Sequence, residues 1–433
     1  MQISGAWRLT ARVFLPFAAG YYLSYLFRTI NALIASHLSS DTGLGSADLG
    51  LLTSVYFLVF AAAQIPAGIL LDRFGPRRVQ SVMLLLAAVG AGVFAVSTSF
   101  LPLLIARAMI GLGVAAALTA GLKSIILWFP RERVALLNGY MVMLGSLGAV
   151  TATAPVEHLL AWMGWRQLFE ILAVATGATA ILIYVVVPER RVVPSIASTP
   201  ATLGSVFDDR RFWRMAPLSA TCIGSAWSLQ GLWASPWLID VEGLDRESLV
   251  RHLFIMSIVL SCGAWSFGTT VHHIKRRGVG AETVLATGAL LFVAAELALI
   301  LRVPLPSILP WSVVAIAGTA TVVSFAVIAD YFPPELAGRA NGALNVLHFG
   351  WAFLAQYATG LILEQWSAND GHRPLQAYQV AFGLNVALQI AALVWFALPR
   401  RRSKPADDSC AQESVGLYED SVILPPADDD AEW

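Results

Sequence analysis

An arginine lies in the middle of the first long apolar segment of the chain, at about residues 13–36. Tyr21, Tyr25 and Arg28 follow one another at spacings of four and three residues. In a helix this spacing places all three side chains on one face, with Asn31 beside them. A guanidinium can hold a carboxylate or a phosphate through two parallel hydrogen bonds, and tyrosine hydroxyls can add further bonds. This face therefore predicts a binding site for a small anion.

The alternative role for Arg28 is a structural ion pair with a buried carboxylate. Acidic residues inside the apolar segments are few and lie near the segment ends, among them Glu157, Glu170, Glu296 and Glu364. None of them is an evident partner for a charge in the middle of a membrane, where an unpaired charge is costly. We therefore favour a substrate anion as the missing counter-charge.

Two later segments, at about 212–239 and 338–364, carry polar and aromatic residues that we expect to face the same site. In a bilayer a polar stripe points toward protein and not toward lipid. The candidate residues on these two segments are Gln230, Trp233, Asn345 and His348. An imidazole titrates near neutral pH, so His348 could carry a coupled proton. The alternative is a histidine that only forms a hydrogen bond within the protein.

The composition places these residues in a membrane protein. Of the 433 residues, 57% are hydrophobic and 13% are charged, whereas a soluble domain carries about 25% charged residues. Lys+Arg and Asp+Glu both number 28, so the net charge is zero and we expect no nucleic-acid partner. The three cysteines have no metal-ligand spacing, and we expect neither a metal site nor a disulfide framework.

Twelve apolar windows are long enough to cross a bilayer as helices, at about 20 residues each. They fall at about 13–36, 48–71, 79–98, 101–128, 135–160, 167–187, 212–239, 250–273, 281–301, 306–331, 338–364 and 377–398. Most of the 28 Lys and Arg side chains fall in the loops on the side of the two termini. This bias predicts that both termini are cytoplasmic.

Two loop sequences recur at nearly one interval, which indicates a duplication. The stretches 129–139 and 332–342 share Phe-Pro, Glu and Asn-Gly at the same internal spacing, and the stretch 68–78 is echoed more loosely at 268–277. We therefore predict an all-α, polytopic fold with two pseudo-symmetric halves of six helices each. The expected parts are a first half at 1–187, a cytoplasmic linker at 188–211, a second half at 212–398 and a disordered tail at 399–433.

A loop rich in glycine and arginine joins the second and third windows. From Gly68 to Arg78 it reads GILLDRFGPRR. Gly68 allows two helices to approach, and Gly75 permits a positive φ. The run resembles the signature loop of the major facilitator superfamily of secondary transporters, in its bacterial form. The resemblance covers nearly the whole chain and implies gating contacts on the cytoplasmic side for Asp72, Arg73, Gly75, Arg77 and Arg78.

The fourth window carries a second resemblance to the same family. Arg107, with Gly111 and Gly113, is similar to the family's Arg-x3-Gly-x-Gly element. Family precedent leaves three roles for Arg107: structural support, a proton relay or contact with substrate. We count it among the substrate-binding candidates. Lys123, further along the same window, could reach the lipid headgroups or add positive potential to the inner cavity.

Together these features predict a secondary active transporter that moves a small organic or inorganic anion by rocker-switch alternating access. Transport would be coupled to proton symport or to exchange with a counter-anion. The alternative is a proton-coupled exporter of hydrophobic or drug-like compounds, which usually needs an acidic residue at mid-depth. The chain carries no phosphate loop, nucleophile elbow or metal constellation, so we expect no enzymatic activity, no catalytic residue and no cofactor.

The expected partners are a small-molecule substrate and membrane lipids, with no nucleic acid. We expect a monomer that crosses the bacterial inner membrane several times.

Overall fold

In the computed structural model the described residues form a bundle of helices. They are residues 9–189, 203–332, 334–368 and 372–398. Nearly all of them are helical, which confirms the predicted all-α fold class. The predicted tail, and residues 190–202 of the predicted linker, lie outside the described residues.

Within the described ranges, eight helical stretches are long and apolar enough to cross a membrane. They are Ser46–Val96, Phe100–Trp128, Glu132–Leu160, Trp165–Val186, Arg246–Ala264, Ala281–Ile300, Gly338–Glu364 and Leu375–Ala397. The first of these, α4, covers two predicted windows because its backbone turns at Gly75, where φ is 79° and ψ is 162°. This positive φ confirms the prediction for Gly75, since glycine adopts it at little steric cost.

The three predicted windows outside these stretches consist of helices that are broken within the span, as are the fourth and fifth windows. The first comprises η1 (Thr10–Phe14), α2 (Leu15–Thr29) and α3 (Asn31–Thr42); the seventh comprises α11 (Arg210–Ser228), η2 (Leu229–Trp233) and α12 (Ala234–Asp240); the tenth comprises α15 (Ile308–Ala317) and α16 (Thr321–Tyr331). Every predicted window is therefore helical, consistent with twelve crossings.

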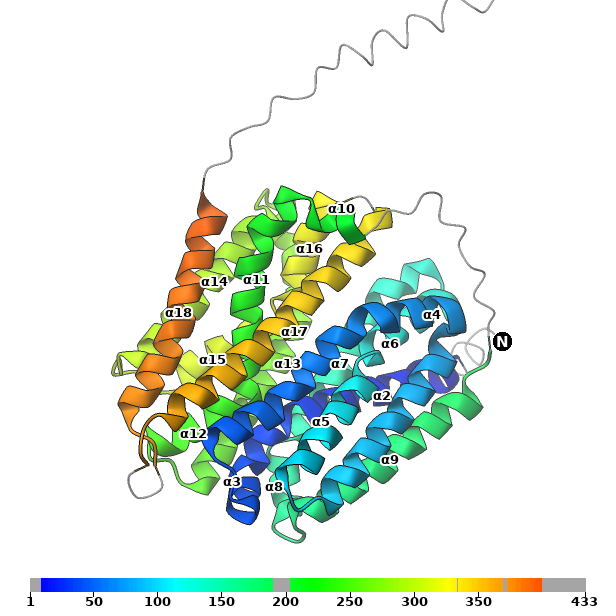
Figure 1. Cartoon of the computed structure of the whole chain (residues 1–433). Helices are drawn as coiled ribbons and strands as arrows, with labels where there is room; N and C mark the ends of the chain where they lie inside the picture. Colours follow the sequence, from blue (N-terminus) through cyan, green and yellow to red (C-terminus); the bar gives the residue numbers. More distant parts are fainter. Residues whose placement is uncertain (1–8, 190–202, 333, 369–371, 399–433) are drawn as a thin grey trace, which may run out of the picture. The chain divides into compact units, whose positions relative to one another are not determined.

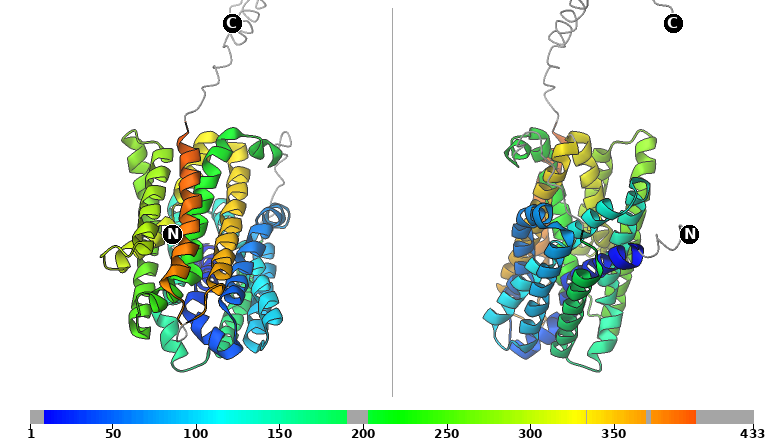
Figure 2. Two further views of the ribbon diagram at one scale, coloured as in Figure 1. Left: turned by 60° about the vertical axis from the view of Figure 1, so that its left-hand side comes forward. Right: turned by 90° about the vertical axis from the view of Figure 1, so that its right-hand side faces the viewer.

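The remaining helices complete the bundle. They are α5 (Phe100–Val114), α6 (Ala117–Trp128), α7 (Arg131–Thr151), α8 (Ala154–Leu160), α9 (Trp165–Val186), the short α10 (Leu203–Phe207), α13 (Arg246–Arg276), α14 (Ala281–Ile300), α17 (Pro334–Glu364) and α18 (Leu375–Ala397). Figure 2 shows that most of the long helices run along one common direction, as expected for a membrane bundle.

The helix breaks repeat at the interval that separates the loop stretches 129–139 and 332–342. The same interval relates the break that follows α5, at Ala115, to the break that follows α15, at Gly318. It also relates the junction of α2 and α3 at Ile30 to the junction of η2 and α12 at Trp233. The duplication is therefore visible in backbone geometry as well as in sequence. The boundaries of the halves at residues 187 and 212 stay a prediction.

The long helices α4 and α17 belong to different halves and lie side by side through the bundle (Figure 1). Their directions are antiparallel. Near one end, a Cβ placed on Gly50 of α4 would lie 3.3 Å from the Cα of Gly360 of α17. Further along, the rings of Phe57 and Phe349 have centroids 6.1 Å apart. This pair forms a large part of the interface between the halves.

Candidate functional site

The broken helices leave backbone carbonyls that need hydrogen-bond donors, because a membrane offers no water to replace them. In the first half, the Ser24 hydroxyl donates to the carbonyl of Val114 at 3.4 Å. In the second half, Trp227 Nε1 donates to the carbonyl of Gly318 at 3.0 Å. Gln230 Nε2 donates to two further carbonyls of α15, at 2.9 and 3.2 Å. Side chains of α2, α11 and η2 thus hold the breaks of the fourth and tenth windows.

Arg28 lies between the halves, close to these breaks. Its guanidinium carbon is 3.9 Å from the centroid of the Tyr25 ring and 5.2 Å from that of the Trp227 ring. Tyr25 belongs to the same half as Arg28, whereas Trp227 belongs to the other half. The described part of the chain contains no carboxylate that forms an ion pair with Arg28. A cation over the face of an aromatic ring is stabilised by attraction to the ring.

Tyr21 supports this arrangement from one turn earlier in α2. Its ring meets the Tyr25 ring edge to face, with centroids 5.2 Å apart. Tyr21 itself is buried and lies against Gly145 of α7, where a Cβ would be 2.3 Å from the ring. The predicted face of Tyr21, Tyr25 and Arg28 is therefore present, with Tyr25 as the ring that stacks on the guanidinium.

Arg107 bonds to Asn31 and to the backbone of α2. The Arg107 side chain is 1% exposed, and its Nη2 donates to the carbonyl of Phe27 at 2.8 Å. With the Asn31 amide oriented so that its oxygen faces the guanidinium, Oδ1 accepts from Arg107 Nε at 3.2 Å and also from Nη2. The Tyr56 ring lies 4.8 Å from the guanidinium carbon. Both residues brace the helix break at Ile30, and substrate contact by either stays a prediction.

Trp233 and Gln230 are also committed to protein contacts. Trp233 is 2% exposed, and its Nε1 donates to the carbonyl of Gln356 at 3.0 Å. Its ring lies against Gly50 and Gly360, where the two halves meet. Gln230 holds the break of the tenth window through the carbonyls of α15. A role of these side chains in substrate contact stays a prediction.

His348 is fully buried one turn beyond the half-buried Asn345 on α17. Its Nε2 is 2.7 Å from Ser219 Oγ, which is also 2.7 Å from Ser324 Oγ. The imidazole meets the Trp227 ring edge to face at 6.0 Å. His348 thus belongs to a hydrogen-bonded group of side chains from α11, α16 and α17, next to Trp227. Its role in proton coupling, and the role of Asn345, stay predictions.

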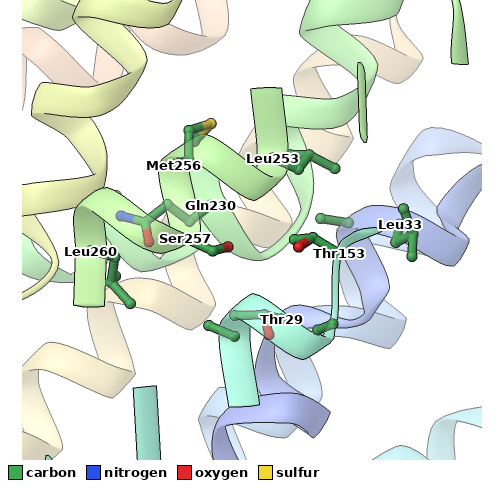
Figure 3. A pocket seen from close by; sticks show the side chains of 11 residues that line it. Thr29, Leu33, Thr153, Gln230, Leu253, Met256, Ser257 and Leu260 are labelled. Carbon is green, nitrogen blue, oxygen red and sulfur yellow. The ribbon is translucent and has the colours of Figure 1, made fainter. Parts of the chain in front are cut away.

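A small pocket lies between the halves, and one of its lining residues, Thr29, directly follows Arg28 in α2 (Figure 3). Thr29 and Thr153 line it from the first half, and Gln230 and Ser257 line it from the second. Its enclosed space fits about one water molecule. Arg28 does not line this pocket. It is therefore a small gap between the halves and is separate from the surroundings of Arg28.

The first part of the glycine- and arginine-rich loop makes its observed contacts within the first half. Asp72 accepts a hydrogen bond from Lys123 Nζ at 2.5 Å, and the same ammonium donates to the carbonyl of Leu71 at 2.8 Å. The Arg73 guanidinium stacks on the ring of Phe74. Sequence reasoning missed the partner of Lys123, because residues 72 and 123 are 51 positions apart.

The two later arginines of the loop contact the end of α9. Arg77 Nε donates to the carbonyl of Tyr184 at 2.8 Å, and its guanidinium carbon lies 4.9 Å from the ring of the same residue. Arg78 forms an ion pair with Glu189. The Arg77 contact with Tyr184 lies within the first half, and the Arg78 contact reaches the start of the predicted linker, so gating by the loop across the interface stays a prediction.

Sequence reasoning also missed the depth of Glu296. Its side chain is fully buried in the second half, and Oε1 accepts from Asn385 Nδ2 at 2.9 Å. The Asn385 amide oxygen in turn accepts from the Ser225 hydroxyl at 2.8 Å. The signal was available in the polar pair Asn385 and Gln389, four residues apart in the last window. Glu296 is thus bonded within this network of the second half.

The chain is a bundle of helices with paired breaks, and the cation of Arg28 lies between its halves. The family model of the Major Facilitator Superfamily matches residues 17–317. The chain belongs to the major facilitator superfamily. This confirms the resemblance that the loop at residues 68–78 indicates, and it makes the chain a multi-pass membrane transporter and not an enzyme.

Other members of the superfamily are similar over different lengths. The hexuronate transporter of Escherichia coli K12 is 24% identical over 424 residues, which cover 91% of this chain and 94% of that protein. A probable sulfoacetate transporter of Cupriavidus necator is 29% identical over 160 residues, 37% of each chain. Among solved structures, a bacterial homolog of the human lysosomal transporter Spinster, inward-facing and unoccupied, has a TM-score of 0.72 at 19% identity. That similarity covers 89% of this chain and 96% of the homolog, and it shows the shared fold.

Proposed function

We propose that this protein is a secondary transporter of small anions and that Arg28 is the residue that binds the anion. The observation that carries the proposal is the cation of Arg28, which lies between the halves without a carboxylate partner among the described residues. An ionised side chain within a membrane bundle usually has a partner or faces a solute path. Hexuronate and sulfoacetate, for which two relatives are named, are anions, and this agrees with the assignment.

The aromatic rings around Arg28 suit this role. The guanidinium carbon lies over the Tyr25 ring and over the Trp227 ring, so the rings contact the cation from both halves. A carboxylate or sulfonate can accept two parallel hydrogen bonds from a guanidinium, which adds geometric specificity to the charge attraction. Because one ring comes from each half, an anion on Arg28 lies at the interface that must open and close during transport.

The contacts between the halves support a closed interface on the side opposite the termini. Arg246 Nε and Nη2 bond the two carboxylate oxygens of Glu157 at 2.7 and 2.6 Å on that side. Phe60 and Phe349, with centroids 4.1 Å apart, close the middle. With both termini in the cytoplasm of a bacterial inner-membrane protein, as the charge bias predicts, this state is inward-facing.

Export of cations is less consistent with the structure. A cation site would need an accessible carboxylate near mid-depth. Glu296 is fully buried in the second half and bonds Asn385. We therefore favour anion transport that is coupled to proton symport or to exchange with another anion. The proposed transporter is a monomer.

A thermal-shift experiment on the purified protein tests the anion assignment. The probes are glucuronate, sulfoacetate and nitrate, with glucose as the uncharged counterpart of glucuronate and a lipophilic cation as the exporter probe. A ligand at 100 times its dissociation constant adds about 2.7 kcal/mol of apparent stability. In Arg28→Gln the affinity should fall at least about tenfold, because a hydrogen bond to a charged group contributes about 1.5–3 kcal/mol.

Arg251→Gln is the matched control, since Arg251 is exposed and its described contact is with Ser248 of its own helix. It should keep the wild-type shift. Equal stabilisation of wild type and Arg28→Gln by an anion would refute the assignment of Arg28. Stabilisation by the lipophilic cation alone would favour the exporter.

A further inference from the structure

The antiparallel helices α4 and α17 belong to different halves, and their backbones approach each other closely at the interface. A Cβ on Gly360 would lie 2.7 Å from the carbonyl oxygen of Ser46 and 3.3 Å from the Cα of Gly50. Only small residues permit two helices to approach so closely. On the side opposite the termini, the end of α17 therefore lies directly beside the start of α4.

At this point a carboxylate of one half caps a helix of the other half. Glu364, the last residue of α17, accepts a hydrogen bond from the backbone N–H of Ala47 at 3.2 Å. Gly45 is the N-cap of α4, and it has no side chain to supply a cap bond. The first N–H groups of a helix lack partners within the helix and favour a negative charge. Glu364 supplies that charge across the interface.

Arg373 holds Glu364 in this position, with Nη2 3.6 Å from Oε2. The helix α4 has an acidic residue of its own in its first turn, Asp48. The carboxylate that bonds the N–H of Ala47 nevertheless comes from the opposite half. The cap therefore forms only while the halves are close on the side opposite the termini.

The part of α4 before the turn at Gly75 has a carboxylate contact near each of its ends, and the two contacts differ. The resemblance of the loop at 68–78 to the family signature already implies a gating contact for Asp72 on the terminal side. In this structure Asp72 bonds Lys123 of its own half, and its side chain is 82% exposed. Glu364, in contrast, bonds the opposite half, and neither the loop sequence nor the family resemblance indicates it.

We propose that Glu364 is a positioning residue of alternating access, which stabilises the state closed on the side opposite the termini by capping α4. When the halves separate on that side, the N–H of Ala47 loses its partner and this stabilisation disappears. The inference rests on the proposed alternating-access mechanism but is independent of which solute is carried.

Distances between spin labels test the cap without any transported solute. The native cysteines Cys222, Cys262 and Cys410 are first replaced by serine. One label pair, Ser40→Cys with Ser367→Cys, then reports separation on the side opposite the termini. A second pair, Glu132→Cys with Arg339→Cys, reports separation on the terminal side. All four labelled positions are exposed.

Glu364→Gln should raise the ratio of terminal-side-closed to opposite-side-closed molecules by about 2- to 5-fold, the range expected for a partly exposed charge at a helix N-terminus. High salt should reduce the difference between this variant and wild type, because salt screens an exposed charge. A residue with only a packing role would not show this salt dependence.

Asp41→Asn is the matched control. Asp41 is a carboxylate of the same side, but it bonds Trp165 of its own half at 2.8 Å. Its substitution should leave the ratio unchanged. The proposal is overturned if Glu364→Gln leaves both distance distributions unchanged or behaves like Asp41→Asn. It is also overturned if the shift is the same at low and high salt. Because no solute is present, failure of the anion assignment of Arg28 would not produce either result.

Discussion

Substitution of Arg107 separates structural support from substrate contact, two of the three roles that sequence alone leaves open. In the structure its guanidinium donates to the carbonyl of Phe27 and to the amide oxygen of Asn31. Both acceptors are close to the break at Ile30, inside a buried part of the bundle. We therefore expect Arg107 to act mainly on stability.

The magnitude follows from the two acceptors. Arg107→Ala leaves both of them without a donor, and each buried unsatisfied group costs about 1–3 kcal/mol. The expected loss is about 2–6 kcal/mol, which should lower the melting temperature by several degrees. Arg107→Lys keeps the charge but cannot place two donors in a fork. It should lose about half as much.

The assay combines thermal unfolding in detergent with anion affinity measured by the same shift. We expect Arg107→Lys to melt several degrees below wild type while its anion affinity stays within about threefold. Nη1 of Arg107 is buried and has no hydrogen-bond partner among the described residues, which gives the competing role a physical basis. A variant that melts like wild type but binds the anion tenfold more weakly would refute the structural assignment.

Two further substitutions test other parts of the fold. Gly148→Ala should destabilise the protein by about 1–3 kcal/mol, because its Cβ would lie 2.2 Å from the carbonyl oxygen of Tyr22. Gly139→Ala is the control, since a Cβ on Gly139 would have no described neighbouring atom within 4 Å. It should be neutral or slightly stabilising in the same unfolding assay. Asp209→Ala should cost about 1 kcal/mol at neutral pH, since Asp209 caps α11 through the N–H of Arg211. Burial raises the pKa of Asp209, but hydrogen bonds from Arg211 outweigh it and lower the pKa below its ordinary value. The pKa of Asp209 is therefore lower in the folded protein than in the unfolded chain. The stability difference between Asp209→Ala and wild type should vanish as the pH falls below about 4. A stability difference that grows in acid would contradict this reasoning.

The fold could be predicted from sequence because its signals are local. Runs of apolar residues of spanning length need only composition, and the turn at Gly75 needs only a residue that tolerates positive φ. The break at Ile30 has no such signal, since neither glycine nor proline occurs there. Its support comes from Arg107 of the fourth window, and tertiary contacts of this kind are not encoded in local pattern.

The site shows the same division. The face of Tyr21, Tyr25 and Arg28 depends on helical spacing alone and is present as predicted. The pairing of Arg107 with Asn31 and that of Lys123 with Asp72 join different windows, and single-sequence reasoning could place each residue but not its partner. Which polar side chain faces solute and which supports a helix break is decided by such pairings.

The contacts between the halves differ in how much they stabilise one state of the proposed alternating-access cycle over the other. Close packing of Gly50 and Gly360 fixes how the halves fit together, but it has little dependence on solute or pH. The ion pair of Arg246 with Glu157 is partly exposed, with 33% and 25% of the side chains accessible, and such pairs typically contribute about 0–1 kcal/mol. A transporter needs both states within a few kcal/mol of each other, so weak charged contacts suit this task better than strong ones. On the proposed assignment, an anion on Arg28 would shift this balance by the difference between its affinities for the two states.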